Sequence, residues 1–156
     1  MSQKWLSFGD DFTVQDEQGR EAFFVDGAAF SWGKNLSIQA PRGNEVGYIA
    51  QKLFSWGPTY EITRGGRVAA IVKKELFTFF RCHFSVDVPG PDDLDAHGDF
   101  LDHEYEITRG DEVVARVSKQ WFTWTDTYGI EVADGEDDAL VVATAVVIDL
   151  CCHQPR

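Results

Sequence analysis

The sequence predicts a mainly β fold, in which a closed antiparallel barrel of about twelve strands surrounds a hydrophobic C-terminal helix. Three observations predict it: repeated hairpin units, apolar residues that alternate within each unit, and an apolar final segment too short to cross a membrane. The chain of 156 residues is long enough for one domain with a sizeable core. We expect residues 1–156 to form that single domain.

Four units of the chain repeat one another. Residues 60–80 and 105–125 are identical at twelve of 21 positions, and both begin Tyr-Glu-Ile-Thr-Arg-Gly. A weaker pair begins at residues 12 and 36, where Phe-Thr-Val-Gln parallels Leu-Ser-Ile-Gln. In each unit a short alternating run precedes a glycine-containing turn and a longer run, which is typical of a β-hairpin.

The hairpin turns are expected at 16–19, 41–44, 64–67 and 109–112, where glycine permits a positive φ. A short strand is expected at 94–99, after a long loop at 88–93. The other predicted strands span about 12–132 and cover residues 12–16, 21–25, 28–32, 36–39, 45–52, 59–64, 67–75, 79–88, 104–109, 112–120 and 124–132. So many antiparallel strands leave exposed edges unless the sheet closes, and a barrel of this size needs something to fill it.

The predicted filling is the segment from Ala139 to Ile148, which is apolar except for Thr144. A membrane-spanning helix needs about 20 such residues, so this segment is too short for one. A helix over about 137–152 would be roughly 22 Å long, which suits the height of a barrel. Helices that are apolar on every face are buried. The valines also suit a central strand, an alternative that the length and the alanine content disfavour.

Composition restricts the partners more than the fold. The formal net charge is −12 and the pI is about 4.6, so we expect no nucleic acid partner. No apolar run follows the first residues, so we expect no signal peptide and no transmembrane segment. Three cysteines, two of them adjacent, are no disulfide framework and indicate a cytoplasmic location.

Several motifs of the chain resemble the LURP-one-related family, which has bacterial members. They are Val88-Pro-Gly-Pro-Asp-Asp-Leu94, Gly98-Asp-Phe-Leu-Asp-His-Glu-Tyr105, Val117-Ser-Lys119 and Ala145-Val-Val-Ile-Asp149. The resemblance covers nearly the whole chain and implies the Tubby C-terminal-like fold, a barrel around a central helix that phospholipid scramblases share by inference. It implies less about function. Tubby domains bind phosphoinositide head groups, and scramblase-like members are tied to phospholipid movement and carry a calcium-associated acidic segment before the helix.

Basic side chains are the first candidate site. The lysines recur at one point of the repeat, and an arginine lies nearby in sequence: Lys52, Lys73, Lys74, Lys119 and Arg81. If they converge, they can bind an anionic phospholipid head group. The alternative is that they are solvated outward positions that prevent pairing between sheet edges.

Acidic and sulfur-containing residues are weaker candidates. The carboxylates before the helix, which could bind Ca²⁺ or simply favour a helix start, are Asp134, Glu136, Asp137 and Asp138. Cys82, Cys151 and Cys152 lack the spacing of a zinc site, so we expect no metal and no other cofactor. Asp149 lies near the end of the helix, where His153, one turn on, can pair with it.

The sequence therefore favours a non-enzymatic binding or scaffold module, expected to be a monomer that recognises a phospholipid head group or a protein partner. It contains no nucleophile elbow, phosphate-binding loop or zinc-protease motif. One alternative is a hydrolase-like enzyme that uses the loop 92–105. Its histidines and carboxylates are His97, His103, Asp92, Asp93, Asp95, Asp99, Asp102 and Glu104. A structural, stress-associated protein with no small ligand is the other alternative.

Overall fold

A computed structural model describes residues 2–7, 12–16, 18, 20–26, 35–52, 58–76, 82–90, 92–119 and 127–152. These residues form twelve strands followed by one helix. The predicted mainly β class with a C-terminal helix is thus confirmed, and the alternative of a terminal strand is wrong. The strand predicted at 28–32 lies outside the described residues.

The elements follow one another along the chain as strands β1–β12 and then helix α1. Their bounds are β1 (Ser2–Ser7), β2 (Phe12–Gln15), β3 (Glu21–Asp26), β4 (Asn35–Gln39), β5 (Glu45–Gln51), β6 (Thr59–Arg64), β7 (Arg67–Leu76), β8 (Cys82–Asp87), β9 (Leu94–Asp99), β10 (Glu104–Arg109), β11 (Glu112–Ser118), β12 (Thr127–Val132) and α1 (Asp138–Cys152). The predicted start of the sheet near residue 12 is wrong, because β1 precedes it. This strand lies outside the repeats, so the repeat pattern could not reveal it.

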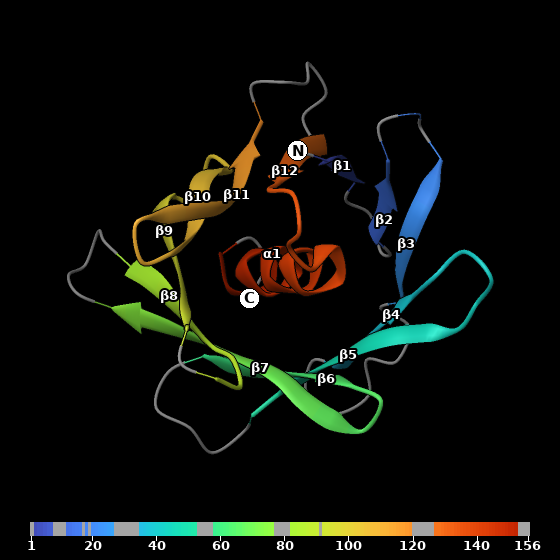
Figure 1. Ribbon diagram of the computed structural model, residues 1–156, viewed down its shortest axis with the longest axis horizontal. Coiled ribbons are helices and arrows are strands. Elements are labelled where there is room, and N and C mark those ends of the chain that lie inside the picture. Colours follow the sequence, from blue (N-terminus) through green and yellow to red (C-terminus); the bar gives the residue numbers. More distant parts are fainter. Residues whose placement is uncertain are drawn as a thin grey trace.

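Each strand pairs antiparallel with the next one in sequence, and β1 also pairs with β12 (Figure 1). The strand order is therefore that of a closed barrel. The seam between the first and last strands runs from Ser2↔Val132 to Ser7↔Thr127. The barrel surrounds α1, which lies in its middle in Figure 1.

The four repeated units form four hairpins with the same irregularity. In each of them the strand register shifts near the turn: after Val14, Ile38, Ile62 and Ile107. The β6–β7 turn joins Arg64 to Arg67 through two glycines with φ values of 58° and 77°. Other residues rarely adopt these φ values, which explains the glycine pair in the sequence.

The core lies between the inner face of the strands and the helix. Alternate strand residues are buried, as the pattern of β4 shows, and residues 141–150 of α1 are all buried. The helix packs against β5, β6, β7 and β12. Its start is capped by Asp137, whose carboxylate accepts the backbone N–H of Leu140 at 3.3 Å. Among the described residues, no helix is long and apolar enough to cross a membrane.

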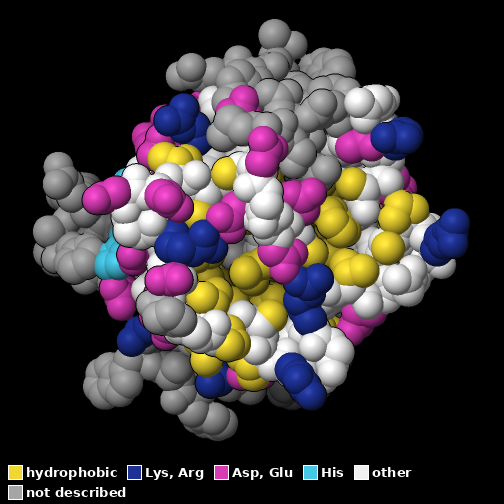
Figure 2. Space-filling model, in the orientation of Figure 1, with side chains coloured by type: hydrophobic (Ala, Val, Ile, Leu, Met, Phe, Trp, Pro, Cys, Tyr) yellow, Lys and Arg dark blue, Asp and Glu magenta, His cyan; other side chains and the backbone are white. Residues whose placement is uncertain are grey.

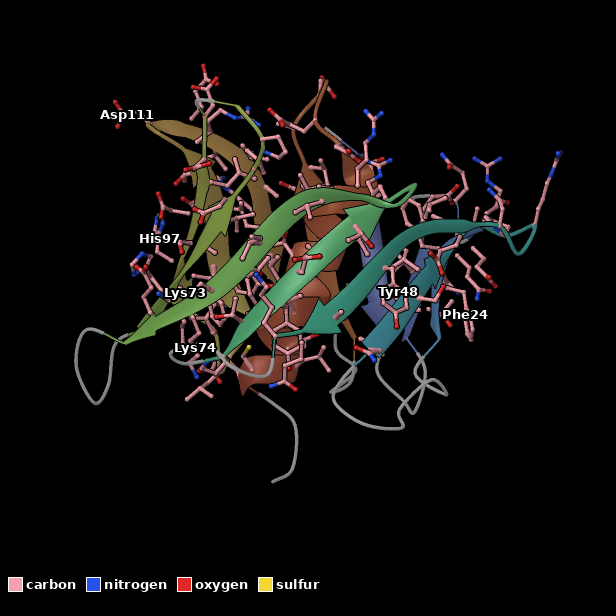
Figure 3. All side chains as sticks on the ribbon, turned by 90° about the horizontal axis from the view of Figure 1, so that it is seen from below. Phe24, Tyr48, Lys73, Lys74, His97 and Asp111 are labelled. Carbon is pink, nitrogen blue, oxygen red and sulfur yellow. The ribbon has the colours of Figure 1, made fainter. Side chains whose placement is uncertain are left out.

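The two ends of the barrel differ in what they contact. At the end where α1 begins, the β6–β7 and β10–β11 turns contact the segment before the helix through Arg64 and Arg109. At the opposite end, the β9–β10 turn contacts the last turns of α1 through His103. Figure 3 shows the helix between these ends, with Asp111 near the first end and Lys74 near the second.

Candidate functional site

The neighbouring strands β5, β6 and β7 bring two of the predicted lysines, Lys52 and Lys73, close together. The backbone N–H of Lys52 donates to the carbonyl of Thr59 at 2.8 Å, and Thr59 pairs in register with Lys73. The neighbouring residues Tyr60 and Val72 are buried in the core. Because strand residues alternate between faces, Thr59 and Lys73 lie on the outer face of the barrel. We call Lys52, Thr59 and Lys73 the lysine row.

The other predicted basic residues do not join this row. Lys74 pairs in register with the buried Phe84, so it occupies the inner face of β7, opposite to Lys73 (Figure 3). Lys119 follows β11, which is separated from β7 by three strands, and its backbone N–H donates to Glu104 at 3.0 Å. Arg81 lies outside the described residues. The predicted cluster is therefore reduced to Lys52 and Lys73 on one face.

The two ammonium groups of the lysine row differ in their partners. Lys52 Nζ lies 3.8 Å from the carboxylate of Glu61, in an exposed and weak ion pair. Lys73 is exposed and makes no ion pair with any described residue. Its charge is thus available to an anion from solution.

Figure 2 shows one end-on face of the molecule, where basic and acidic side chains are interspersed. Within the described part of that face, the basic side chains stand apart from one another. The described part of this face therefore presents no broad basic patch.

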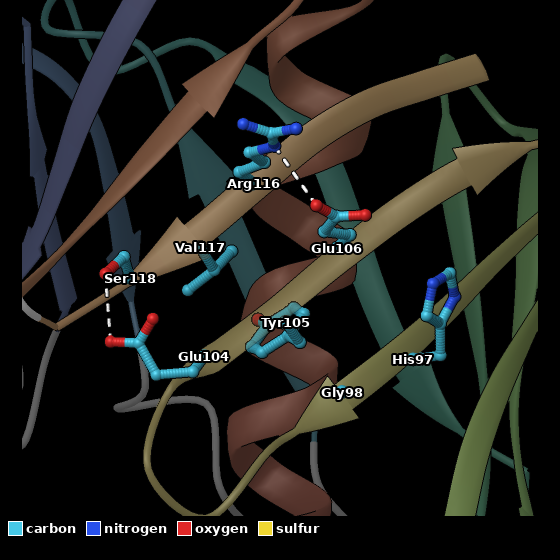
Figure 4. A pocket seen from close by; sticks show the side chains of 8 residues that line it. All are labelled: His97, Gly98, Glu104, Tyr105, Glu106, Arg116, Val117 and Ser118. Atoms are coloured by element: carbon cyan, nitrogen blue, oxygen red, sulfur yellow. Dashed lines mark hydrogen bonds and ion pairs between the residues drawn. The ribbon is translucent and has the colours of Figure 1, made fainter.

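A shallow groove of about 560 Å³ crosses the outer face of β9, β10 and β11 (Figure 4). Arg116, Glu106 and His97 are register partners across these strands, and Arg116 Nε lies 3.1 Å from Glu106 Oε1. On the other side of the groove, Glu104 Oε1 accepts the hydroxyl of Ser118 at 2.9 Å. Both glutamates thus already have partners within the protein, Arg116 for Glu106 and Ser118 for Glu104.

The predicted acid–base group of loop 92–105 is not brought together. His97 is exposed on the outer face of β9, whereas His103 is 7% exposed and faces the helix. Asp95 lies 3.7 Å from His83, and Asp99 accepts the backbone N–H of Asp102 at 3.1 Å. The two histidines therefore lie in different surroundings, His97 exposed on β9 and His103 buried in the β9–β10 turn against α1.

The partner of Asp149 is a residue that the sequence analysis did not pair with it. Asp149 is 2% exposed, and its Oδ1 lies 3.1 Å from Nε2 of His103, 46 residues earlier in the chain. The sequence predicted His153, which lies outside the described residues. A carboxylate in an apolar helix does indicate a partner, but only the fold identifies which histidine lies next to it.

Two repeat-related tyrosines lie beside the end of the helix. Burial raises the pKa of Tyr105 well above its usual value, and the charges of Asp149 and Cys152 raise it further. Burial also raises the pKa of Tyr60, with a smaller effect of Cys151. The Tyr105 hydroxyl is buried and has no hydrogen-bond partner in the described part of the chain.

The acidic segment before the helix is held by two repeat-related arginines. Arg64 pairs with Asp137, and Arg109 donates to both carboxylate oxygens of Glu136 at 2.7 and 3.0 Å. The hydrogen bonds and charge of Arg109 lower the pKa of Glu136 despite partial burial.

Two of the four carboxylates considered for Ca²⁺, Glu136 and Asp137, thus already have cationic partners within the protein. The described residues contain no group of three or more metal-ligating side chains. Cys151 and Cys152 are not joined in a disulfide and are half-buried at the end of α1.

A barrel built from hairpin repeats around an apolar helix defines a fold family, and comparisons identify it. A model of the LURP-one-related family matches residues 1–149, so the chain belongs to this family. It is 35% identical over 153 residues to the uncharacterised protein YxjI of Bacillus subtilis, covering 98% of this chain and 92% of that protein. The X-ray structure of an Arabidopsis thaliana protein has the same fold, with a TM-score of 0.69 at 16% identity over 94% of this chain and 88% of that one.

Proposed function

We propose that the protein is a non-enzymatic binding module, and that an anionic phosphate group such as a phospholipid head group binds at the lysine row. The observation that carries the proposal is the register that sets Lys52 and Lys73 on either side of Thr59. Two strand spacings of about 4.8 Å separate the two lysines. Thr59 itself is buried, at 5% exposure, so the long side chains of the two lysines can converge on one phosphate at the surface beside it rather than on Thr59.

The charges around the row support this location. Lys73 makes no ion pair with a described residue, and the exposed pair between Lys52 and Glu61 costs little to exchange for a phosphate contact. A phosphate offers several strong acceptor oxygens to the two ammonium groups. Because the site is exposed, ions in solution should screen the interaction, and binding should weaken as salt is added.

The positions of the histidines favour binding over hydrolysis. A general base needs to reach the same substrate as its partner groups. His97 is exposed on the outer face of β9, whereas His103 is buried in the β9–β10 turn and faces α1. The buried pair of His103 with Asp149 fits a structural role in fixing the helix.

Co-sedimentation with vesicles tests the proposed function. The full chain should bind vesicles that contain anionic phospholipid at low ionic strength and bind neutral vesicles less. Lys73→Glu should reduce that binding strongly. Lys119→Glu introduces the same charge change at the same end of the barrel, three strands away, and serves as the matched control.

Soluble inorganic phosphate, added as a competitor, separates a lipid site from a general phosphate site. Competition at millimolar phosphate would indicate recognition of the phosphate alone, whereas resistance would indicate that the lipid surface contributes. Equal loss of binding in Lys73→Glu and Lys119→Glu would contradict the assigned location. Failure to bind both anionic vesicles and phosphate would contradict the function.

We also propose that the barrel stays closed in solution along the seam between β1 and β12. Six register pairs support it, and the closed wall leaves no edge strand exposed. Deletion of residues 1–7 should expose β12 and lower the protection of its amides from hydrogen exchange. Unchanged protection from Gly129 to Val132 would argue that the seam is open.

A further inference from the structure

Within the described strands, a backbone ladder joins the tip of the β9–β10 hairpin to the barrel on one side. The ladder between β8 and β9 ends at the pair Phe84↔Ala96. The ladder between β9 and β10 continues to the pair Asp99↔Glu104. Among the described strands, residues 97–99 are therefore paired with β10 alone, and no backbone ladder joins them to β8.

Side chains, in place of the missing ladder, hold this tip against the barrel. Phe100 is buried. Its ring packs edge-on against that of Phe84 at 4.9 Å, and at a tilt of 51° against that of Tyr105 at 5.0 Å. His103, from the same turn, reaches inward to Asp149 of the helix at 3.1 Å. One short turn thus inserts two side chains into the end of the barrel.

The backbone of this segment is unusual at two positions. His103 has a φ of 53°, which is uncommon for a residue other than glycine and is maintained only where the surroundings impose it. Gly98 has a φ of 136°, and a Cβ there would lie 2.6 Å from the carbonyl oxygen of Glu104. Glycine adopts its φ at Gly98 without strain, whereas the φ of His103 is uncommon for its residue type, so a change of backbone angles at His103 would release strain.

Polar groups lie beneath the segment, inside an otherwise apolar interior. They are the carboxylate of Asp149 and the hydroxyl of Tyr105, which has no hydrogen-bond partner among the described residues. Cys152 lies close enough to influence Tyr105. A buried hydroxyl of this kind is costly unless it reaches water or another polar group.

We propose that residues 97–103 form a flap, with the His103–Asp149 contact as its latch, which opens locally between β8 and β9. Opening gives water and small polar solutes access to Asp149 and Tyr105 at the end of α1. The flap is independent of the lysine row, because it lies on other strands and needs no anionic ligand.

Hydrogen exchange of the full chain, followed residue by residue by NMR, tests the flap. His103→Asn removes the imidazole that reaches Asp149, and asparagine tolerates the positive φ. This variant should raise the exchange rates of residues 97–103 by about tenfold or more, as expected for loss of a hydrogen bond to a charged group. His97→Asn makes the same chemical change on the exposed face of the same segment and should leave those rates within about twofold.

The distribution of the changes decides the outcome. Faster exchange confined to residues 97–103 and to the amides beside Asp149 supports the flap. An equal increase in the β6–β7 hairpin, the repeat counterpart, would show global destabilisation and overturn the proposal. If His103→Asn does not fold, the same measurement on the wild-type protein tests the flap. The amides of residues 97–103 should then exchange through an opening that costs less free energy than global unfolding, and exchange only through global unfolding would overturn the proposal.

Discussion

Removing the buried hydroxyl of Tyr105 should stabilise the protein, whereas most substitutions of buried residues lower the free energy of unfolding. Tyr105 is 3% exposed, and its hydroxyl finds no hydrogen-bond partner in the described residues. Leaving such a group unpaired costs about 1–3 kcal/mol. Tyr105→Phe removes that cost and keeps the ring that packs at 5.0 Å against Phe100. We therefore expect the free energy of unfolding to rise by about 1–3 kcal/mol.

Urea denaturation at neutral pH, followed by circular dichroism, measures the change directly, provided that the slope is the same in both proteins. The melting temperature should rise by about 2–4 °C for each kcal/mol in a chain of this size. Tyr60→Phe is the matched control, because it makes the same change at the equivalent position of the other repeat. Its hydroxyl is not among the buried groups that lack a partner, so this variant should gain less.

Destabilisation of Tyr105→Phe by about 1 kcal/mol or more would refute this reasoning. That result would mean that the hydroxyl makes a favourable hydrogen bond in solution. The same gain in both tyrosine variants would also contradict it, because the effect would then come from the ring rather than from the unpaired hydroxyl.

Three further predictions concern the helix and its attachments. Ile148→Ala, at a fully buried position of α1, should lower the free energy of unfolding by about 2–5 kcal/mol in urea denaturation. Gly98→Ala should destabilise more than Gly66→Ala, because a Cβ at Gly98 meets the Glu104 carbonyl oxygen at 2.6 Å whereas one at Gly66 meets nothing within 4 Å; equal losses would contradict this. The pKa of Glu136 is lowered on folding, so its pair with Arg109 adds stability above the unfolded pKa that is lost as pH falls through the folded pKa. Wild type and Glu136→Gln should therefore differ most near neutral pH and converge in acid; a difference that is independent of pH would argue against the pair.

The hairpin units and the buried helix were predictable because each leaves a local signal. The repeat beginning Tyr-Glu-Ile-Thr-Arg-Gly aligned β6–β7 with β10–β11, and glycines marked the turns. The helix was predicted over 137–152 and is found from Asp138 to Cys152, since a run apolar on every face can only be buried. β1 was missed because six residues without a repeat or a turn carry no comparable signal.

The candidate site was less predictable because it depends on register and strand order. The sequence grouped Lys73 with Lys74, but adjacent residues of a strand face opposite ways, and only Lys73 shares a face with Lys52. The sequence also placed Lys119 with them, although three strands intervene.

The internal contacts depended on the fold in the same way. The pairing of Asp149 with His103 spans 46 residues, and no local spacing could have indicated it. The arginines of the two related hairpins, Arg64 and Arg109, reach the segment before the helix because their turns lie at the same end of the barrel.

The central claim is that the apolar helix α1 lies enclosed by the strands of its own barrel. Amide hydrogen exchange from Val141 to Val146, the part of α1 away from the flap contact at Asp149, tests it most directly on the full chain. Enclosure predicts that these amides exchange only through global unfolding, with a free energy equal to that from urea denaturation. Exchange of the helix amides well before those of β5–β7 would show that the helix leaves the barrel on its own, and would contradict the account.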